Sequence, residues 1–96
     1  MTDLLAPDHA ETLALNALAH IAGDEDALAG FLAATGLTPG DLRASAGESH
    51  VLIGVMDYLL ADEQRLLAFC AEAEIAPELP ALTRASLPGG QEMHWT

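Results

Sequence analysis

The histidines are the first residues of this chain that could do chemistry, because an imidazole nitrogen is a common metal ligand. They are spread along the sequence, at His9, His20, His50 and His94. Two of them have a carboxylate at a workable spacing, in the segments His9-x-Glu11 and His20-x3-Asp24. Each of these half-sites lacks a third ligand, so the sequence predicts no metal site. His20 is better explained as an amphipathic residue at the edge of the core.

Cys70 is the single cysteine, which excludes an intrachain disulfide and a cysteine metal cage. A nucleophilic thiol would need a nearby base and an electropositive setting. Cys70 instead occupies an inward-facing helical position, where a buried packing thiol is the favoured interpretation. The sequence therefore predicts no catalytic residues, no cofactor site and no enzyme.

Asp57 is the one charged residue in the apolar run VLIGVMDYLLA, residues 51–61. Two interpretations are open for it. A desolvated carboxylate would need a cation beside it, which one of the three arginines could supply. The favoured alternative is that Asp57 marks the one stripe of this helix that reaches water.

The charge balance excludes two classes of partner. Asp and Glu total 15, against three arginines and no lysine, and the formal net charge is −12. The cations Arg43, Arg65 and Arg84 are far apart in sequence, whereas nucleic-acid binding depends on clustered cations that neutralise phosphates. Anionic lipid surfaces are disfavoured for the same reason. A basic partner protein or metal cations stay open on electrostatic grounds, but the favoured interpretation is that the negative charge serves solubility.

The segment FLAATGLTPGDLRA has the helix, glycine turn and helix pattern of many DNA-binding regulators. A DNA reader needs cations on its second helix. That helix would offer Arg43 alone, beside Asp41 and Glu48. The sequence therefore predicts a structural turn here, without DNA binding.

Composition predicts an all-α domain that positions these residues. The 96 residues include 19 alanines and 17 leucines, which have high helix propensity and are not β-branched. This length is enough for one domain with a single core. The apolar run 51–61 is too short to span a membrane and is predicted to be the buried central helix. We expect one domain over 8–88, a lead-in over 1–7 and a mobile tail over 89–96.

Capping patterns mark the first helices. Asp8 and Glu11 fit a capping box that opens a first helix, and Gly23 is expected to end it in the left-handed conformation. Asp24 is expected to cap the second helix. The predicted inner face of the first helix consists of Ala10, Leu13, Ala14, Ala17, Leu18 and Ile21.

Gly36 is the predicted stop of the second helix. Thr38, with Pro39 at the first position and Asp41 at the third, is the predicted cap of a short third helix. Ser49 is the predicted cap of the central helix.

A straight helix from 50 to 74 would turn Asp62 toward the core, which is costly without partners. We therefore expect a break there, with Asp62 capping a fifth helix that buries Leu66, Phe69, Cys70 and Ala73. Pro77 is expected to open the last helix. Glu74 should end the fifth helix in a left-handed conformation, because Ala76 precedes a proline and the helix must stop by then.

A shift of 38 residues aligns the chain with itself. Asp24-Glu25 falls on Asp62-Glu63, Phe31 on Phe69 and Pro39 on Pro77. The alternative is chance in a chain rich in Leu and Ala. We favour a structural repeat because Phe and Pro are rare here and both coincide. The fold prediction is a compact bundle of about six helices, built as two pseudo-repeated three-helix units.

The stretches LALNALAHIAGDEDALAGFLAATGLTPGDLRA and MDYLLADEQRLLAFCAEAEIAPE resemble a family of small bacterial proteins, Domain of Unknown Function 3572. The marks of the resemblance are the G-L-x-P-x-D-L turn at 36–42 and the L-L-A-D-E segment at 59–63. The similarity covers residues 9–88. It implies a compact helical fold and no established activity, and it transfers no functional residues.

The leading functional prediction is a small acidic, non-enzymatic helical domain that binds an unknown partner protein, for which a basic protein is one option, and acts in protein-protein interaction or regulation. A homodimer is a variant of this prediction, since mean hydropathy is +0.26. The alternative is an acidic decoy, similar to a DNA mimic, that binds a basic protein. The N-terminal segment lacks the basic and long apolar regions of a signal peptide, so we expect a cytoplasmic protein that binds neither membranes nor nucleic acid.

Overall fold

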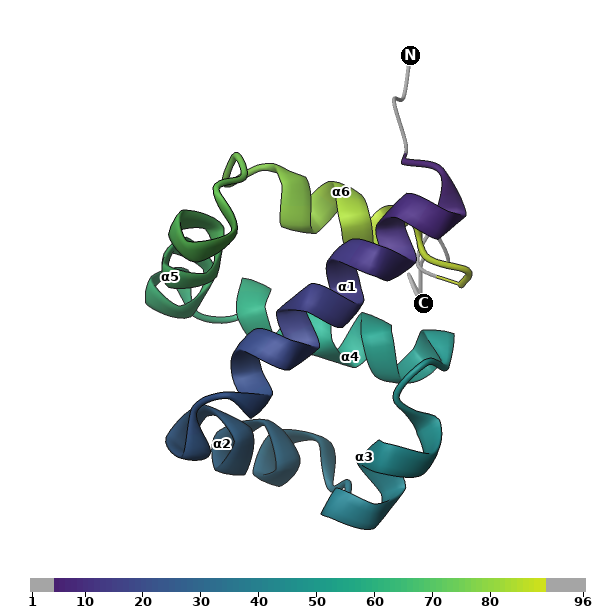
Figure 1. The fold of residues 1–96 in the computed structure, drawn as a ribbon, viewed down its shortest axis with the longest axis vertical. Coiled ribbons are helices and arrows are strands. Elements are labelled where there is room, and N and C mark those ends of the chain that lie inside the picture. Colours follow the sequence, from purple (N-terminus) through teal and green to yellow (C-terminus); the bar gives the residue numbers. More distant parts are fainter. Residues whose placement is uncertain (1–4, 90–96) are drawn as a thin grey trace, which may run out of the picture.

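A computed structural model describes residues 5–89 and contains six α-helices over that range. Their bounds are α1 Pro7–Ala22, α2 Glu25–Thr35, α3 Pro39–Ser45, α4 Ser49–Leu60, α5 Glu63–Ala73 and α6 Leu79–Ser86. Figure 1 shows α1 crossing α4, with α2 and α3 at one end of the molecule and α6 at the other. No strand occurs within residues 5–89, and the prediction of an all-α bundle of about six helices is confirmed.

The core forms where α1 packs against α4. Every residue of the predicted inner face of α1 is buried. In α4 the buried residues are Val51, Leu52, Val55, Met56 and Leu59, which confirms α4 as the central helix. Burial of this apolar stripe, worth about 25 cal/mol per Å² removed from water, is what holds the two helices together.

The flanking helices α2 and α5 each insert one phenylalanine into this core. Phe31 is 0% exposed and Phe69 is 2% exposed. Helix α6 packs against both α1 and α4. The Leu5 N–H donates to Ser86 Oγ at 2.8 Å and ties the start of the described chain to α6.

Three predicted helix starts are confirmed by their hydrogen bonds. Asp24 Oδ1 accepts from the N–H groups of Asp26 and Ala27, and Asp62 Oδ1 accepts from those of Gln64 and Arg65. Thr38 and Asp41 form a reciprocal capping box at α3. Such side chains satisfy N–H groups that the helix itself leaves without partners.

Two predicted helix ends are confirmed as well. Gly36 has φ 79° and ψ 5°, and Glu74 has φ 58° and ψ 48°, both in the left-handed region. The Ile75 N–H donates to the Cys70 carbonyl at 3.0 Å, and the Glu74 N–H donates to the Ala71 carbonyl at 3.3 Å. These are the two hydrogen bonds of a Schellman turn. Glu74 is the one non-glycine residue between 5 and 89 with a positive φ.

The predicted capping box of α1 was wrong, and Gly23 ends the helix as predicted but not in the predicted left-handed conformation. The helix begins at Pro7 rather than after Asp8, and its N-cap, Ala6, makes no side-chain hydrogen bond. Proline at the first position has no N–H to satisfy, which lowers the need for a cap. Gly23 has φ −78° and is right-handed, because the extended conformation of Asp24 already ends the helix.

Three further details differ from the prediction. Ser49 is the first residue of α4 rather than its cap, and its Oγ donates to the Pro88 carbonyl. Helix α6 begins at Leu79 instead of Pro77, because a start at 77 would place Pro80 inside the helix, where proline is costly. Ala73 is exposed rather than buried.

The 38-residue shift relates some parts of the structure and fails for others. The caps Asp24 and Asp62, the left-handed ends Gly36 and Glu74, and the lengths of α2 and α5 correspond. The third helix of each half, α3 or α6, differs. Helix α6 packs extensively on the central pair, α1 and α4, and α3 has no comparable contact with any other helix. Superposition of the two halves stays a prediction. The predicted tail at 89–96 lies outside the described residues except for Gly89.

Candidate functional site

A groove runs along α1 on the side that faces α5 and the start of α6. It consists of two adjoining hollows, with cavity volumes of about 390 Å³ and about 180 Å³, that share Asn16, Phe69 and Ala73. The lining residues are His9, Thr12, Leu13, Asn16, Ala19, His20, Phe69, Glu72, Ala73, Ile75 and Leu79. We call this feature the α1–α5 groove.

The floor of the α1–α5 groove is apolar and its rim is polar. Leu13 and Phe69 are buried at the floor, and Ile75 and Leu79 are half-buried beside them. Exposed His9, Thr12 and Asn16 form one rim along α1, and exposed Glu72 lies on the other. Concave sites with an apolar floor and a few polar groups are where proteins usually bind ligands or partner segments.

His20 and Glu72 join the two walls of the groove at one end. His20 Nδ1 is within hydrogen-bonding contact of Glu72 Oε1, and the His20 ring packs on Phe69 with centroids 5.4 Å apart. The His20 side chain is 26% exposed, whereas Glu72 is 67% exposed. Glu72 therefore offers a solvent-facing carboxylate to anything that enters the groove.

A second hollow of about 390 Å³ lies between α2 and α4, lined by Ala34, Thr35, Gly54, Asp57, Tyr58, Ala61 and Arg65. We call it the α2–α4 hollow. Five of its lining residues are the 38-residue counterparts of residues in the groove: Ala34 of Glu72, Thr35 of Ala73, Gly54 of Asn16, Asp57 of Ala19 and Tyr58 of His20. The ring contacts correspond too, because Tyr58 packs on Phe31 at 5.6 Å just as His20 packs on Phe69.

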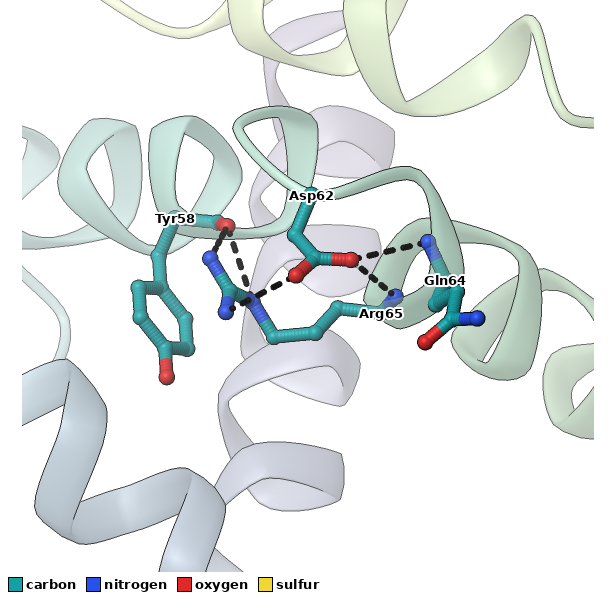
Figure 2. Close-up of polar contacts among 4 residues, drawn as sticks. All are labelled: Tyr58, Asp62, Gln64 and Arg65. Carbon is teal, nitrogen blue, oxygen red and sulfur yellow. Dashed lines mark hydrogen bonds and ion pairs between the residues drawn. The ribbon is translucent and has the colours of Figure 1, made fainter.

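The α2–α4 hollow differs from the groove by the cation that covers its aromatic ring. Figure 2 shows the Arg65 side chain folded back over Tyr58 and Asp62. The guanidinium carbon lies 3.7 Å from the Tyr58 ring centroid, and Nε and Nη2 donate to the Tyr58 carbonyl at 3.2 and 2.9 Å. Arg65 thus supplies donors to the C-terminal end of α4, where backbone carbonyls lack helical partners.

The structure confirms the favoured interpretation of Asp57, that it lies on the stripe of α4 that reaches water, and it adds the arginine pair without the desolvation. Its side chain is 53% exposed, as expected for the stripe of α4 that reaches water. It also pairs with Arg84 of α6. The pair links α4 to α6, which makes Asp57 a structural residue with no exceptional burial.

The thiol of Cys70 is buried, as predicted. Burial raises the pKa of the Cys70 thiol, and the negative charge of Glu78 raises it further. Both effects disfavour the thiolate, which is the nucleophilic form. Cys70 is a packing residue of α5.

The histidines do not converge. His9 and His20 lie along the groove, while His50 is exposed and lies 3.4 Å from Glu48. His94 falls outside the described residues. Between residues 5 and 89, no three His, Cys, Asp or Glu side chains come together as a metal site would require.

The cations are also dispersed. Arg43 is exposed on the seven-residue helix α3, while Arg65 and Arg84 pair with Asp62 and Asp57. The predicted helix–turn–helix segment forms α2 and α3, yet it presents a single cation. Within the described part of the chain, no helix combines the length and apolar character needed to cross a membrane.

The α1–α5 groove was not predicted from the sequence. Its floor joins Leu13 to residues 56 to 66 positions further along the chain, and helical periodicity shows only which face of each helix is inward. The alignment of His20 with Tyr58 under the 38-residue shift was the one available indication that these two rings occupy related places.

Comparison with known proteins identifies a family for nearly the whole chain. No curated protein and no solved structure matches it. The family model described as "Protein of unknown function (DUF3572)" matches residues 7–90. The match covers all six helices of the described chain, including those that line the groove and the hollow. The chain belongs to the DUF3572 family.

Proposed function

We propose that this chain is a non-enzymatic, acidic helical domain that binds a partner protein through the α1–α5 groove. The observation that carries the proposal is the groove itself, with its floor of Leu13, Phe69, Ile75 and Leu79 between polar rims. Helical segments of partner proteins dock in grooves of this kind. A cytoplasmic location fits this role and is part of the proposal.

The chemistry of the groove favours binding over catalysis. His20 and Glu72 could exchange a proton with a ligand, but neither serine nor cysteine lines the groove, and its one hydroxyl, that of Thr12, lies in the other of the two hollows. The buried thiol of Cys70 is held in its neutral form. Acyl transfer through a covalent intermediate needs a nucleophile within reach of the base, and the hollow that holds His20 and Glu72 has no serine, threonine or cysteine in its lining.

The surface charge favours a basic partner. Arg65 and Arg84 are half-buried and paired with carboxylates, so most of the exposed charge on residues 5–89 is negative. The same observation favours the second candidate, an acidic decoy that binds a basic protein through its overall charge. The two differ in salt dependence, because a charge-driven complex weakens strongly with salt and an apolar groove complex weakens little.

A second copy of this chain is a further candidate partner. Leu15 and Leu67 are the large apolar residues exposed on the described surface, at 38% and 44%. Sedimentation that shows only monomer at high micromolar protein would exclude the homodimer.

Site-specific photo-crosslinking tests the groove against a matched position. Ala73 lines the groove, and its 38-residue counterpart Thr35 lines the α2–α4 hollow, and both are exposed. A photoreactive residue at 73 should trap a defined protein in the native cell, and the same residue at 35 should not. Equal trapping at the two positions, or none at 73, would contradict groove binding.

A further inference from the structure

We infer that the occupant of the α1–α5 groove is one amphipathic helix of the partner, about three turns long, with a basic side chain that pairs with Glu72. This inference rests on the proposed function and names the partner's binding element. It is carried by three features of the groove: its length, the place of its carboxylates and its contrast with the α2–α4 hollow.

The length and floor of the groove suit a helix. The rim on α1 extends from His9 to His20, which is about 16 Å at 1.5 Å per residue. The floor presents apolar side chains along this distance, from Leu79 and Ile75 to Phe69. An amphipathic helix projects apolar residues at i, i+4 and i+7 onto one face and so contacts such a floor along its length. An extended segment would need a strand edge for pairing, and residues 5–89 contain no strand.

The charges beside the groove call for a cation on that helix. Glu72 is a mostly exposed carboxylate whose only described partner is the half-buried His20. Glu78, exposed just before α6, adds a second carboxylate near the other end, close enough to act on Cys70. No arginine lines the groove, and among the described residues His20 is the one basic side chain in contact with Glu72, so a lysine or arginine of the incoming helix can approach the exposed side of this carboxylate.

Comparison with the α2–α4 hollow indicates why a basic helix would bind the α1–α5 groove and not the related hollow. In that hollow the counterpart of Glu72 is Ala34, and Arg65 lies over the ring of Tyr58. The carboxylate that does line the hollow, Asp57, is paired with Arg84. A basic helix placed there would meet a carboxylate that is already paired with an arginine, and it would also approach the Arg65 guanidinium. The same difference supplies a matched control, because Thr35 and Ala73 occupy corresponding positions.

The test uses two labelled probe peptides and the full chain. Both peptides have the same helical apolar face of leucines, and their polar faces carry either lysine and arginine or glutamate. Fluorescence anisotropy is measured for the unaltered chain and for Glu72→Gln, Ala73→Arg and Thr35→Arg, after thermal melting has confirmed that each is folded. The expected result is that the basic peptide binds at least about tenfold tighter than the acidic one. Glu72→Gln should lower its affinity about threefold to fivefold and reduce its salt dependence. Ala73→Arg should abolish binding, and Thr35→Arg should leave it unchanged.

The outcomes separate this inference from the proposed function. If both peptides bind equally, or if neither binds while crosslinking at position 73 persists, the basic-helix occupant is wrong and the groove still binds protein. If the basic peptide binds the Ala73→Arg variant as tightly as the unaltered chain, the groove is not the site, and both proposals are overturned.

Discussion

The α1–α5 groove and the α2–α4 hollow are built on corresponding helices and differ in a few side chains. His20 packs on Phe69 in one, and Tyr58 packs on Phe31 in the other. The groove ends in the exposed carboxylate of Glu72, whereas the hollow is partly covered by Arg65. Helix placement can therefore be repeated while the charged groups offered to a ligand change: the groove offers a carboxylate with no arginine beside it, and the hollow offers Asp57 and Arg65, each already in an ion pair.

The third helices show where this correspondence stops. Helix α6 buries Pro80, Thr83 and Ser86 against the central pair, whereas Leu42 is the buried residue of α3. Capping depends on residues within one turn, and it is repeated at Asp24 and Asp62. Docking of a third helix depends on distant surfaces, and those surfaces differ between the two halves.

Replacing the paired phenylalanines is expected to have the largest effect. Phe31→Ala and Phe69→Ala should each lower the free energy of unfolding by about 3–5 kcal/mol, because each leaves a cavity in the core. Urea denaturation of the two variants measures the difference. Losses within about 1 kcal/mol of each other would support equivalent environments. A loss below about 1 kcal/mol for either variant would show that the two phenylalanines do not occupy equivalent core sites.

Removing the helix caps should cost less. Asp24→Ala should lower the free energy of unfolding by about 1 kcal/mol. Asp62→Ala should cost a few tenths of a kcal/mol more, because Asp62 also pairs with Arg65 at 3.5 Å. The Asp→Asn variants retain a capping oxygen and serve as controls. A larger loss of stability for Asp24→Ala than for Asp62→Ala would contradict the expected contribution of the Asp62–Arg65 pair.

The two left-handed helix ends should respond in opposite directions. Gly36→Ala should destabilise by roughly 1 kcal/mol, and Glu74→Gly should stabilise by a similar amount, because a side chain is disfavoured at positive φ. Chemical denaturation midpoints measure both changes. Glu74→Asn is the control, since asparagine tolerates this conformation. A midpoint that falls for Glu74→Gly would show that glycine there behaves as it does inside a helix.

Replacing Thr83 is expected to have the smallest effect on the free energy of unfolding. Its Oγ1 is buried without a hydrogen-bond partner, so Thr83→Val should raise the free energy of unfolding by on the order of 0.5 kcal/mol. The counterpart Ser45 is half-buried in α3, and Ser45→Ala should have almost no effect. Differential scanning calorimetry of both variants would detect the difference. Destabilisation by valine would mean that the hydroxyl contributes a bond in solution.

Local patterns in the sequence were enough to predict six helices, the break at Asp62 and the left-handed end at Glu74. These features depend on a few neighbouring residues, such as a capping carboxylate or a residue that precedes a proline. Pro77 alone favours a helix start at that residue, but Pro80 is costly inside a helix and so moves the start of α6 to Leu79. Ser49 was missed as a bonding partner of Pro88 because that contact spans 39 positions.

The candidate site was less predictable than the fold. Its polar ends, His20 and Glu72, are 52 positions apart, and their contact depends on how α5 lies beside α1. The exposure of Ala73 follows from the same arrangement, since the groove opens where a packed interface was expected. Periodicity assigns a residue to a helix face, but it does not say which neighbour covers that face.

The buried thiol of Cys70 has a kinetic consequence. Its Sγ lies 3.9 Å from the Ala76 carbonyl, under the turn that joins α5 to α6, and its neutral form persists to higher pH than that of a free thiol. A thiol reagent can reach it only when this corner opens, so the rate of labelling counts opening events. A partner that holds α5 against α1 would make those events rarer. The rate at which a thiol reagent labels Cys70 in the unaltered chain would therefore fall when a partner occupies the groove.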